Sequence, residues 1–383
     1  MMDFLPNADE LRIQGLARSY ARGPLAERAA AHDAGAFPTA SVLGLAGFGL
    51  MGIKSPVALG GLGGTNVAYV LAIREVAQVC ASTAVTMAVT NMVGDMLLQF
   101  GTAAQQERWL RPLLTGAFTA GAFALTEPSA GSDAASLGTK AVLSDDGNTY
   151  ALTGTKMWIT SGDVAGVILV MAKTDADAGA RGISAFLVDP ASAGFSVGRH
   201  EQKMGLKGSS TVSLTFDGVK VPVEDRLGPE GIGFRIAMTA LDGGRCGIGA
   251  QALGIAQASL DAVLASMAAR KRDDRALGTD QAAAFRIADM ATRMEAAWLM
   301  VLRASALKDA GQRMSREAAM AKVFATEAAG FVTKTAMGLA SAADLRTDSP
   351  IGRAYRDARV ARIYEGTSEV QRIVIARELV RAS

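Results

Sequence analysis

The segment Tyr-Glu-Gly-Thr-Ser at 364–368 places a carboxyl group directly before a predicted helix. Ser368 and Gln371 have the spacing of a capping box, and apolar residues follow at helical spacing: Val370, Ile373, Val374 and Ile375. An acid at this position would at least complement the helix dipole, by about 0.3–1 kcal/mol. A carboxyl group fixed in such a turn could also act as a general base, and Glu365 is the candidate catalytic residue.

Four other segments complete a pattern that covers nearly the whole chain. They are LTEPSAGSD at 125–133, KMWITSG at 156–162, KMGLKGS at 203–209 and LDGGR at 241–245. In residue type, order and spacing, these segments and the C-terminal one are similar to those of the acyl-CoA dehydrogenase family. The resemblance gives Glu365 its functional interpretation, because a lone acid near a helix start is common on protein surfaces.

The composition excludes several other classes of protein. The 383 residues include 39 basic and 37 acidic side chains, and no basic run is interleaved with aromatics, so a nucleic-acid partner is not expected. Cys80 and Cys246 lie far apart, no targeting segment is evident and no run of 18 apolar residues occurs, which predicts a cytoplasmic protein without a membrane span. His32 and His200 are expected at the surface, and no metal site is expected.

The pattern of apolar residues along the chain changes twice. Residues 1–120 read as helices, 121–231 as short strands separated by turn clusters, and 232–383 again as helices. The clearest strands are 167–171, 183–188 and 212–216, and the clearest long helices are 250–270, 281–309 and 317–339. The resemblance implies an α+β multidomain fold, with an N-terminal all-α domain, a middle β-barrel and a C-terminal four-helix bundle.

The resemblance also implies a cofactor and a reaction. The family binds FAD and dehydrogenates an acyl-CoA thioester to the trans-2-enoyl-CoA, with a base removing the α-proton and flavin N5 accepting the β-hydride. Glu365 matches the base, its backbone N–H would polarise the thioester oxygen together with a flavin ribityl hydroxyl, and Gly366 would let the substrate approach closely. Electrons would pass to an electron-transfer flavoprotein.

Other residues are assigned to the cofactor and the substrate by position. Asp242 and Arg245, with Ser132 and Gly366, match the substrate-binding set; an i,i+3 helical ion pair is the alternative interpretation of Asp242 and Arg245. Thr126 and Ser132 match the pyrimidine and pyrophosphate side of the flavin, Trp158 flanks the ring system, and the Thr160 hydroxyl reaches N5. The cofactor set as a whole is Leu125, Thr126, Ser132, Trp158, Ile159, Thr160, Arg270, Gln281, Thr367 and Glu369.

Some members of the family carry the base at the position occupied here by Gly244. Glycine cannot act as a base, so Glu365 has no competitor in this chain. The choice of position favours a straight-chain, short or medium acyl-CoA.

Two segments depart from the family pattern, and both belong to the part expected to face a neighbouring subunit. Arg270 and Gln281 match residues that reach the neighbour's FAD, but Asp273-Asp274 replaces Phe-Gly between them, and 338–344 lacks the expected glycine-rich run. Either a homotetramer holds FAD with an altered adenosine site, or the chain pairs with a second acyl-CoA dehydrogenase-like subunit. A desulfinase, nitroalkane oxidase or monooxygenase reaction on the same fold, and a non-catalytic subunit, are the other hypotheses.

Overall fold

The computed structural model describes residues 5–272, 275–276 and 280–382, so Asp273-Asp274 lies outside the described residues. The chain begins with helices: α1 (Ala8–Tyr20), α2 (Ala29–Asp33), α3 (Thr39–Gly47), α4 (Asn66–Val79), α5 (Ala81–Phe100), α6 (Ala103–Gln105) and α7 (Arg111–Thr115). After α1 the regular helix ends, because a π-helical turn over Ala21–Leu25 contains Pro24, which has no N–H to continue the helical hydrogen bonds.

The middle part of the chain is a sheet of eight strands. Its elements are β1 (Ala120–Ala124), β2 (Lys140–Leu143), β3 (Thr149–Thr160), β4 (Ala165–Lys173), β5 (Ile183–Val188), β6 (Phe195–His200), β7 (Thr211–Pro222) and β8 (Arg226–Leu227). The order across the sheet is β6-β7-β3-β2-β4-β5-β8, with β1 pairing in parallel with β4. Alternate residues of β3, β4 and β7 face one apolar cluster that includes Leu152, Val170 and Phe216, which explains the alternating pattern in the sequence.

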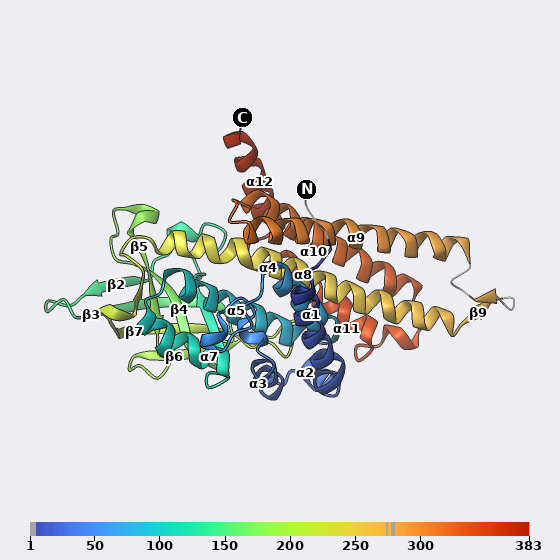
Figure 1. Ribbon diagram of the computed structural model, residues 1–383, viewed down its shortest axis with the longest axis horizontal. Helices are drawn as coiled ribbons and strands as arrows, with labels where there is room; N and C mark the ends of the chain where they lie inside the picture. The colour runs from blue at the N-terminus through green and yellow to red at the C-terminus, as the bar shows by residue number, and fades with distance from the viewer. Residues whose placement is uncertain (1–4, 273–274, 277–279, 383) are drawn as a thin grey trace.

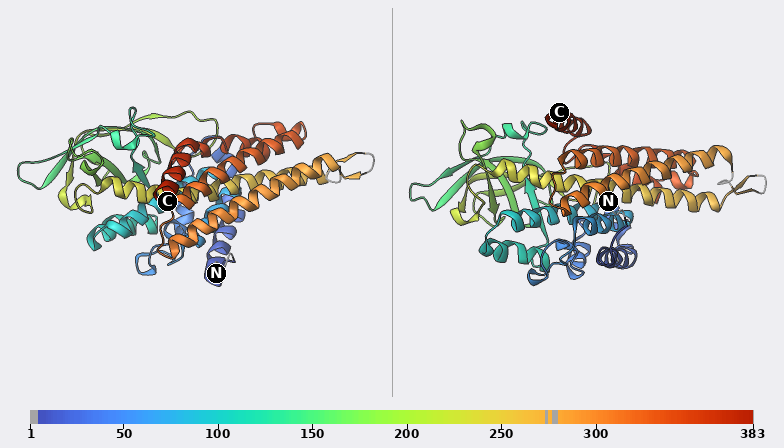
Figure 2. Two further views of the ribbon diagram at one scale, coloured as in Figure 1. Left: turned by 90° about the horizontal axis from the view of Figure 1, so that it is seen from above. Right: turned by 45° about the horizontal axis from the view of Figure 1, so that its top comes forward.

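The C-terminal part is a set of long helices packed side by side (Figures 1 and 2). They are α8 (Gly233–Ala268), α9 (Gln281–Asp309), α10 (Ser315–Leu339), α11 (Pro350–Asp357) and α12 (Ser368–Ala382), with a small hairpin of β9 (Lys271–Arg272) and β10 (Arg275–Ala276) between α8 and α9. The hairpin and the sheet lie at opposite ends of the molecule (Figure 1). This helix–sheet–helix order confirms the expected fold class.

Helix α8 is the axis of the molecule, because α4, α5, α9, α10 and α11 all pack against it. It has the length and hydropathy of a membrane span, but 67% of its most apolar window is buried inside the protein. A helix covered in this way is a core helix.

The expectation that both histidines lie at the surface was wrong for His32. Its ring is buried, and Nε2 lies 2.9 Å from the Ser41 hydroxyl, while burial lowers the pKa of the imidazole. His200 is exposed at the end of β6. Among the described residues no cluster of His, Cys, Asp and Glu side chains has the geometry of a metal site.

A buried ion pair joins the loop after β1 to the middle of β3. Lys156 Nζ donates to Glu127 Oε1 at 2.7 Å and to the Leu125 carbonyl at 3.0 Å, and both charged side chains are buried. Glu127 also accepts from the backbone N–H groups of Gly138 and Thr139, at 2.6 and 3.0 Å, and from the Thr139 hydroxyl. Burial alone would raise the pKa of Glu127, but Lys156 and these donors lower it, and both groups are ionised at neutral pH.

Breaking this pair should destabilise the sheet domain strongly. Lys156→Met leaves the Glu127 carboxylate buried without its cation, and we expect a loss of about 3–5 kcal/mol in the free energy of unfolding. The double variant Lys156→Met with Glu127→Gln removes both charges and should recover part of that loss. Chemical denaturation monitored by circular dichroism measures both, and an equal loss in single and double variants would contradict a role for the unpaired charge.

Candidate active site

Glu365 lies in a tight turn between the short helix Val360–Arg362 and α12. Glu365 has φ +52° and Gly366 has φ +89°, so two consecutive residues adopt the left-handed conformation, which is unfavourable for a glutamate. The helix begins at Ser368, one residue earlier than a cap at Ser368 would allow, and the predicted capping box is not formed. Thr367 caps the helix instead, its hydroxyl accepting from the Val370 N–H at 3.3 Å, and the buried Ser368 hydroxyl has no hydrogen-bond partner among the described residues.

Two buried side chains donate hydrogen bonds to the backbone carbonyls of this turn. Gln371 Nε2 donates to the Gly366 carbonyl at 2.9 Å and to the Glu365 carbonyl at 3.3 Å, and Lys322 Nζ on α10 donates to the same Gly366 carbonyl at 2.7 Å. Gln371 therefore acts on the backbone of the turn rather than as the helix cap that its spacing predicted.

The Glu365 carboxyl group is the least satisfied polar group of the site. The residue as a whole is partly exposed, but Oε2 is buried and has no hydrogen-bond partner among the described residues. Burial raises the pKa of Glu365 to about 7, against the opposing effects of Lys322 and Arg245. A carboxyl group with this pKa can both take and release a proton near neutral pH.

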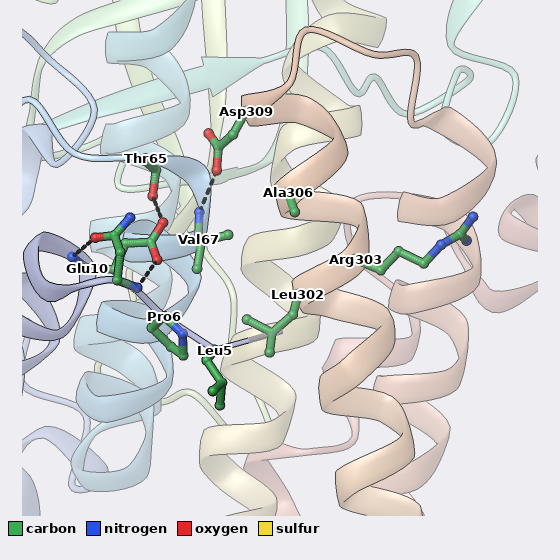
Figure 3. A pocket seen from close by; sticks show the side chains of 10 residues that line it. Leu5, Pro6, Glu10, Thr65, Val67, Leu302, Arg303, Ala306 and Asp309 are labelled. Carbon is green, nitrogen blue, oxygen red and sulfur yellow. Dashed lines mark hydrogen bonds between the residues drawn. The ribbon is translucent and has the colours of Figure 1, made fainter. Parts of the chain in front are cut away.

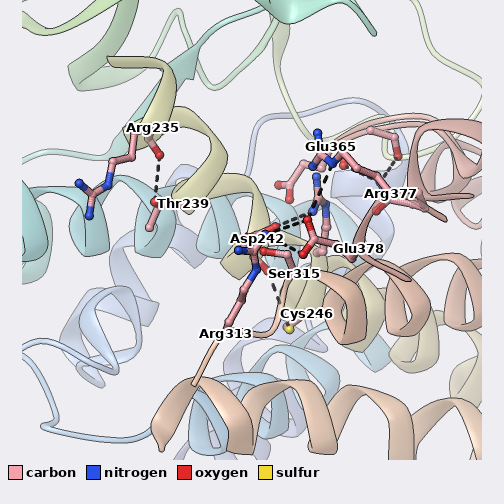
Figure 4. Close-up of polar contacts among 12 residues, drawn as sticks. Arg235, Thr239, Asp242, Cys246, Arg313, Ser315, Glu365, Arg377 and Glu378 are labelled. Atoms are coloured by element: carbon pink, nitrogen blue, oxygen red, sulfur yellow. Dashed lines mark hydrogen bonds and ion pairs between the residues drawn. The ribbon is translucent and has the colours of Figure 1, made fainter. Parts of the chain in front are cut away.

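Helix α8 leaves room for this carboxyl group at one glycine. A Cβ atom built on Gly244 would lie 2.1 Å from Glu365 Oε2, so any other residue at this position would displace the carboxylate. On either side of Gly244 in the same helix, Arg245 Nη1 pairs with Asp242 Oδ1 at 2.5 Å, and Asp242 Oδ2 accepts from the Ser315 hydroxyl at 2.5 Å. Figure 4 shows Asp242, Ser315 and Glu365 within one group of polar side chains. Asp242 and Arg245 thus form the predicted i,i+3 ion pair at the site itself.

A second surface, formed by the sheet, carries the residues assigned to the flavin. The Met157 N–H donates to the Thr126 carbonyl at 2.9 Å, which sets the two flavin-assigned segments side by side. Trp158 has φ +57° and is 58% exposed, so its indole faces outward rather than into the core. Thr160 ends β3 and is half-buried, Leu125 and Ile159 are buried beneath this surface, and Ser132 is exposed.

The residues of this surface fit a flavin. The hydroxyl and backbone groups of this surface can hydrogen-bond to a flavin ring system without adding charge. The exposed indole of Trp158 offers an apolar face. Ser161 and Ser210, next to Thr160 and its strand partner Thr211, have buried hydroxyls without a partner among the described residues. A cavity of about 490 Å³, lined in part by Asp163, Ser210 and Thr211, opens beside them.

Three other residues assigned to the cofactor, Arg270, Gln281 and Glu369, lie in the C-terminal helical part rather than on the sheet. Arg270 and Gln281 lie at the hairpin end of α8 and α9, far from the sheet (Figure 1). Arg270 Nη2 donates to the Leu339 carbonyl at 2.5 Å, and Gln281 is exposed. Glu369 is exposed on the first turn of α12. Within one chain, therefore, Arg270 and Gln281 are not brought together with Thr126 and Trp158.

The second segment that departs from the family pattern, 338–344, is held in place by hydrogen bonds to Asp344. Asp344 Oδ2 accepts from the Ser341 N–H and hydroxyl, at 2.9 and 2.6 Å, and from the Ser266 hydroxyl at 2.6 Å. These bonds lower the pKa of Asp344, so this end of α8 carries a carboxylate where the family pattern has glycine.

Another pocket lies between the N-terminal segment, α4 and α9 (Figure 3). Its volume is about 270 Å³, and its lining includes Glu10, Thr65 and Asp309. Asp309 accepts from the first N–H groups of α4, which makes it a helix cap. None of the residues assigned to catalysis, cofactor or substrate lines this pocket.

The sequence reasoning missed Lys322, which is the buried cation beside Glu365. It stands within a helical run of buried alanines, at 318, 321, 325 and 329, so a charged residue interrupts an otherwise apolar face of α10. That interruption was the available signal.

A carboxyl group with a raised pKa, together with an aromatic and hydroxyl-bearing surface on the sheet domain, suits a flavin-dependent oxidoreductase. Family models place the chain more narrowly. The N-terminal, middle and C-terminal domains of acyl-CoA dehydrogenase match residues 7–117, 122–219 and 231–380.

Individual relatives agree with the family models. The chain is 40% identical to a short-chain specific acyl-CoA dehydrogenase of Clostridium acetobutylicum, over 99% of this chain and 100% of that protein. It is 41% identical to the caffeyl-CoA reductase-Etf complex subunit CarC of Acetobacterium woodii, over 96% and 97% of the two chains. The solved structure of butyryl-CoA dehydrogenase from Megasphaera elsdenii has a TM-score of 0.96 at 39% identity, covering 99% of this chain and 100% of that one. The chain belongs to the acyl-CoA dehydrogenase family, it is an oxidoreductase, and its cofactor is FAD.

Filling the gap at Gly244 should disable the base while leaving the fold intact. We expect Gly244→Ala to displace the Glu365 carboxylate and to lower kcat/KM about 100-fold, the scale of a misplacement by about 1 Å. Gly330→Ala, on α10 with open space around it, is the matched control. Steady-state kinetics with bound FAD quantified in parallel measures this, and an unchanged kcat/KM would contradict the predicted clash.

Proposed function

We propose that this protein dehydrogenates a short or medium straight-chain acyl-CoA between Cα and Cβ, with Glu365 as the base that removes the α-proton. The observation that carries the proposal is the buried Oε2 of Glu365, which has no hydrogen-bond partner among the described residues and lies in a turn of two left-handed residues. Sequence likeness to a short-chain specific acyl-CoA dehydrogenase and structural likeness to a butyryl-CoA dehydrogenase support the same class of substrate.

The residues of the site suit proton abstraction next to a thioester. Because Glu365 is withdrawn from water, its carboxylate is more basic than an exposed one, which narrows the gap to the pKa of the α-proton. Gly366 has no side chain that would keep a thioester away from the turn. We assign the backbone N–H of Glu365 as a hydrogen-bond donor to the thioester oxygen. When bound, FAD supplies a hydride acceptor for the β-hydrogen.

We assign an electron-transfer flavoprotein as the redox partner. The CarC relative is named as a subunit of a complex with Etf, and that is what supports the assignment. The proton chemistry itself favours neither direction, since a carboxyl group with a pKa of about 7 can take up or return a proton. The partner's reduction potential would therefore decide whether oxidation or reduction of the acyl chain prevails.

The distance between the two sets of residues assigned to the cofactor supports an assembly of two or more subunits. The 36 residues of α8 span about 54 Å at 1.5 Å per residue. Arg270 follows one end of this helix, and the flavin-assigned surface lies near the other end, too far apart for one FAD to touch both within a chain. We propose that Arg270 and Gln281 serve the FAD of a neighbouring subunit, in a homotetramer or a heteromer.

Replacing the base should abolish turnover and leave the cofactor in place. For Glu365→Gln we expect kcat/KM with butyryl-CoA to fall by about 10²- to 10⁴-fold, the usual contribution of a positioned base. The control is Glu27→Gln, an exposed glutamate that belongs to none of the assigned sets. Flavin absorbance during anaerobic addition of butyryl-CoA is the measurement. Bleaching by the Gln variant at the wild-type rate would refute the assignment of Glu365.

The composition of the assembly separates the two oligomer hypotheses. The homomer hypothesis predicts that the purified chain forms one species with one FAD per subunit, and that Arg270→Ala lowers this FAD content. Size-exclusion chromatography with light scattering and flavin quantification measures both quantities. A colourless protein that gains flavin only with a second subunit would favour the heteromer.

A further inference from the structure

The proposal in this subsection rests on the function proposed for Glu365 and concerns a different residue. We propose that Lys322 is a positioning residue for the reaction: it fixes the turn that carries Glu365, and its charge keeps the Glu365 carboxylate ionised at working pH.

The burial of Lys322 needs a reason beyond packing. Its side chain has 0% exposure on the inner face of α10, among alanines such as Ala318, Ala325 and Ala329. An isolated ammonium group is costly to bury, and an apolar side chain of similar length would fill the same space. Among the salt bridges between described residues none involves Lys322, so no close ion pair explains its place in the core.

The geometry of the Lys322 ammonium group points to the catalytic turn. Its hydrogen bond ends on the Gly366 carbonyl at 2.7 Å, directly after Glu365. Gln371 Nε2 donates to the same oxygen at 2.9 Å. Two donors from two different helices thus fix the peptide group that follows two consecutive left-handed residues, a conformation that persists only where the surroundings enforce it.

The charges around the pair come from every element packed against it. On α8, Arg245 also favours an ionised Glu365, but its charge is shared with Asp242 at 2.5 Å. Glu369 on α12 and Arg362 in the preceding short helix act on Lys322 in opposite senses. Tyr69 on α4 is buried and Tyr364 in the turn is partly buried, and desolvation together with the nearby Glu365 charge raises the pKa of each phenol.

Of the two cations that lower the pKa of Glu365, Lys322 therefore has the larger effect. Arg245 is paired with Asp242, whereas Lys322 forms no ion pair among the described residues. Burial and Glu365 act on it in opposite directions, and the pKa of Lys322 is lowered to about 8, so it remains mostly protonated at pH 7. For Glu365 the attraction of Lys322 is the largest effect opposing burial. Loss of this charge would raise the pKa of Glu365, and the base would then be protonated over a wider range of pH.

The role of the charge can be separated from the role of the hydrogen bond by three variants. Lys322→Met removes both, Lys322→Gln keeps a donor but no charge, and Gln371→Met removes only the neutral donor. The holoenzyme is incubated in D2O with 3-thiabutyryl-CoA, which can lose an α-proton but has no hydrogen on its β-atom to transfer. Deuterium uptake at Cα, followed by mass spectrometry against pH, then reports the proton-abstraction step alone.

The wild type should lose exchange activity as the pH falls through about 7, because protonated Glu365 cannot act as a base. For both Lys322 variants we expect this midpoint to move upward by about 1 pH unit or more, the usual effect of removing an opposite charge at close range. Gln371→Met should slow exchange at every pH with its midpoint unchanged. Bound FAD and circular dichroism establish folding, and Lys322→Gln provides the measurement if Lys322→Met does not fold.

The outcomes distinguish this proposal from the one on which it rests. Exchange by the wild type that Glu365→Gln abolishes, with an unmoved midpoint in the Lys322 variants, would overturn the role of Lys322 and leave the function standing. No exchange by the wild type above the level of Glu365→Gln would overturn both proposals.

Discussion

Keeping one carboxyl group out of water, in a turn between α8, α10 and α12, is the constraint on which the active site depends. A carboxylate in that position is unstable unless something compensates for its lost hydration. The structure compensates only in part: Lys322 and Arg245 attract the charge of Glu365, but none of the described residues donates a hydrogen bond to its Oε2. The remaining instability is what makes the group basic enough for the chemistry we propose.

The buried pair of Glu127 and Lys156 shows the opposite arrangement. There, the carboxylate accepts from an ammonium group, two backbone N–H groups and a hydroxyl, so its pKa is held low and its proton chemistry is suppressed. Its role is to fix the loop after β1 against β3, which carries Trp158 and Thr160. One buried acid thus supports the flavin-assigned surface, and another, whose Oε2 has no partner among the described residues, is the candidate base.

Much of the fold could be predicted from the sequence, because long-range packing agrees with local pattern. The helix at 281–309 and the strand at 183–188 were predicted to the residue, since their apolar periodicity and flanking turns coincide with their real ends. His32 and Lys322 could not be placed, because the burial of a polar side chain depends on neighbours distant in sequence, such as Ser41 and Gly366. Ser368 was taken as the cap because its spacing to Gln371 fits, but that amide is engaged by the turn.

The contact between Gly244 and Glu365 constrains how such an enzyme can evolve. The two positions compete for one volume, since even a methyl group on α8 would overlap the carboxylate of the turn. A lineage that moved its base from the turn to α8 could not add the second acid while the first was present, nor discard the first without passing through an inactive form. Crossing between the two arrangements would require a duplicate gene free of selection, or two substitutions fixed together. The two base positions are therefore expected to mark separate, long-lived branches rather than interchangeable variants.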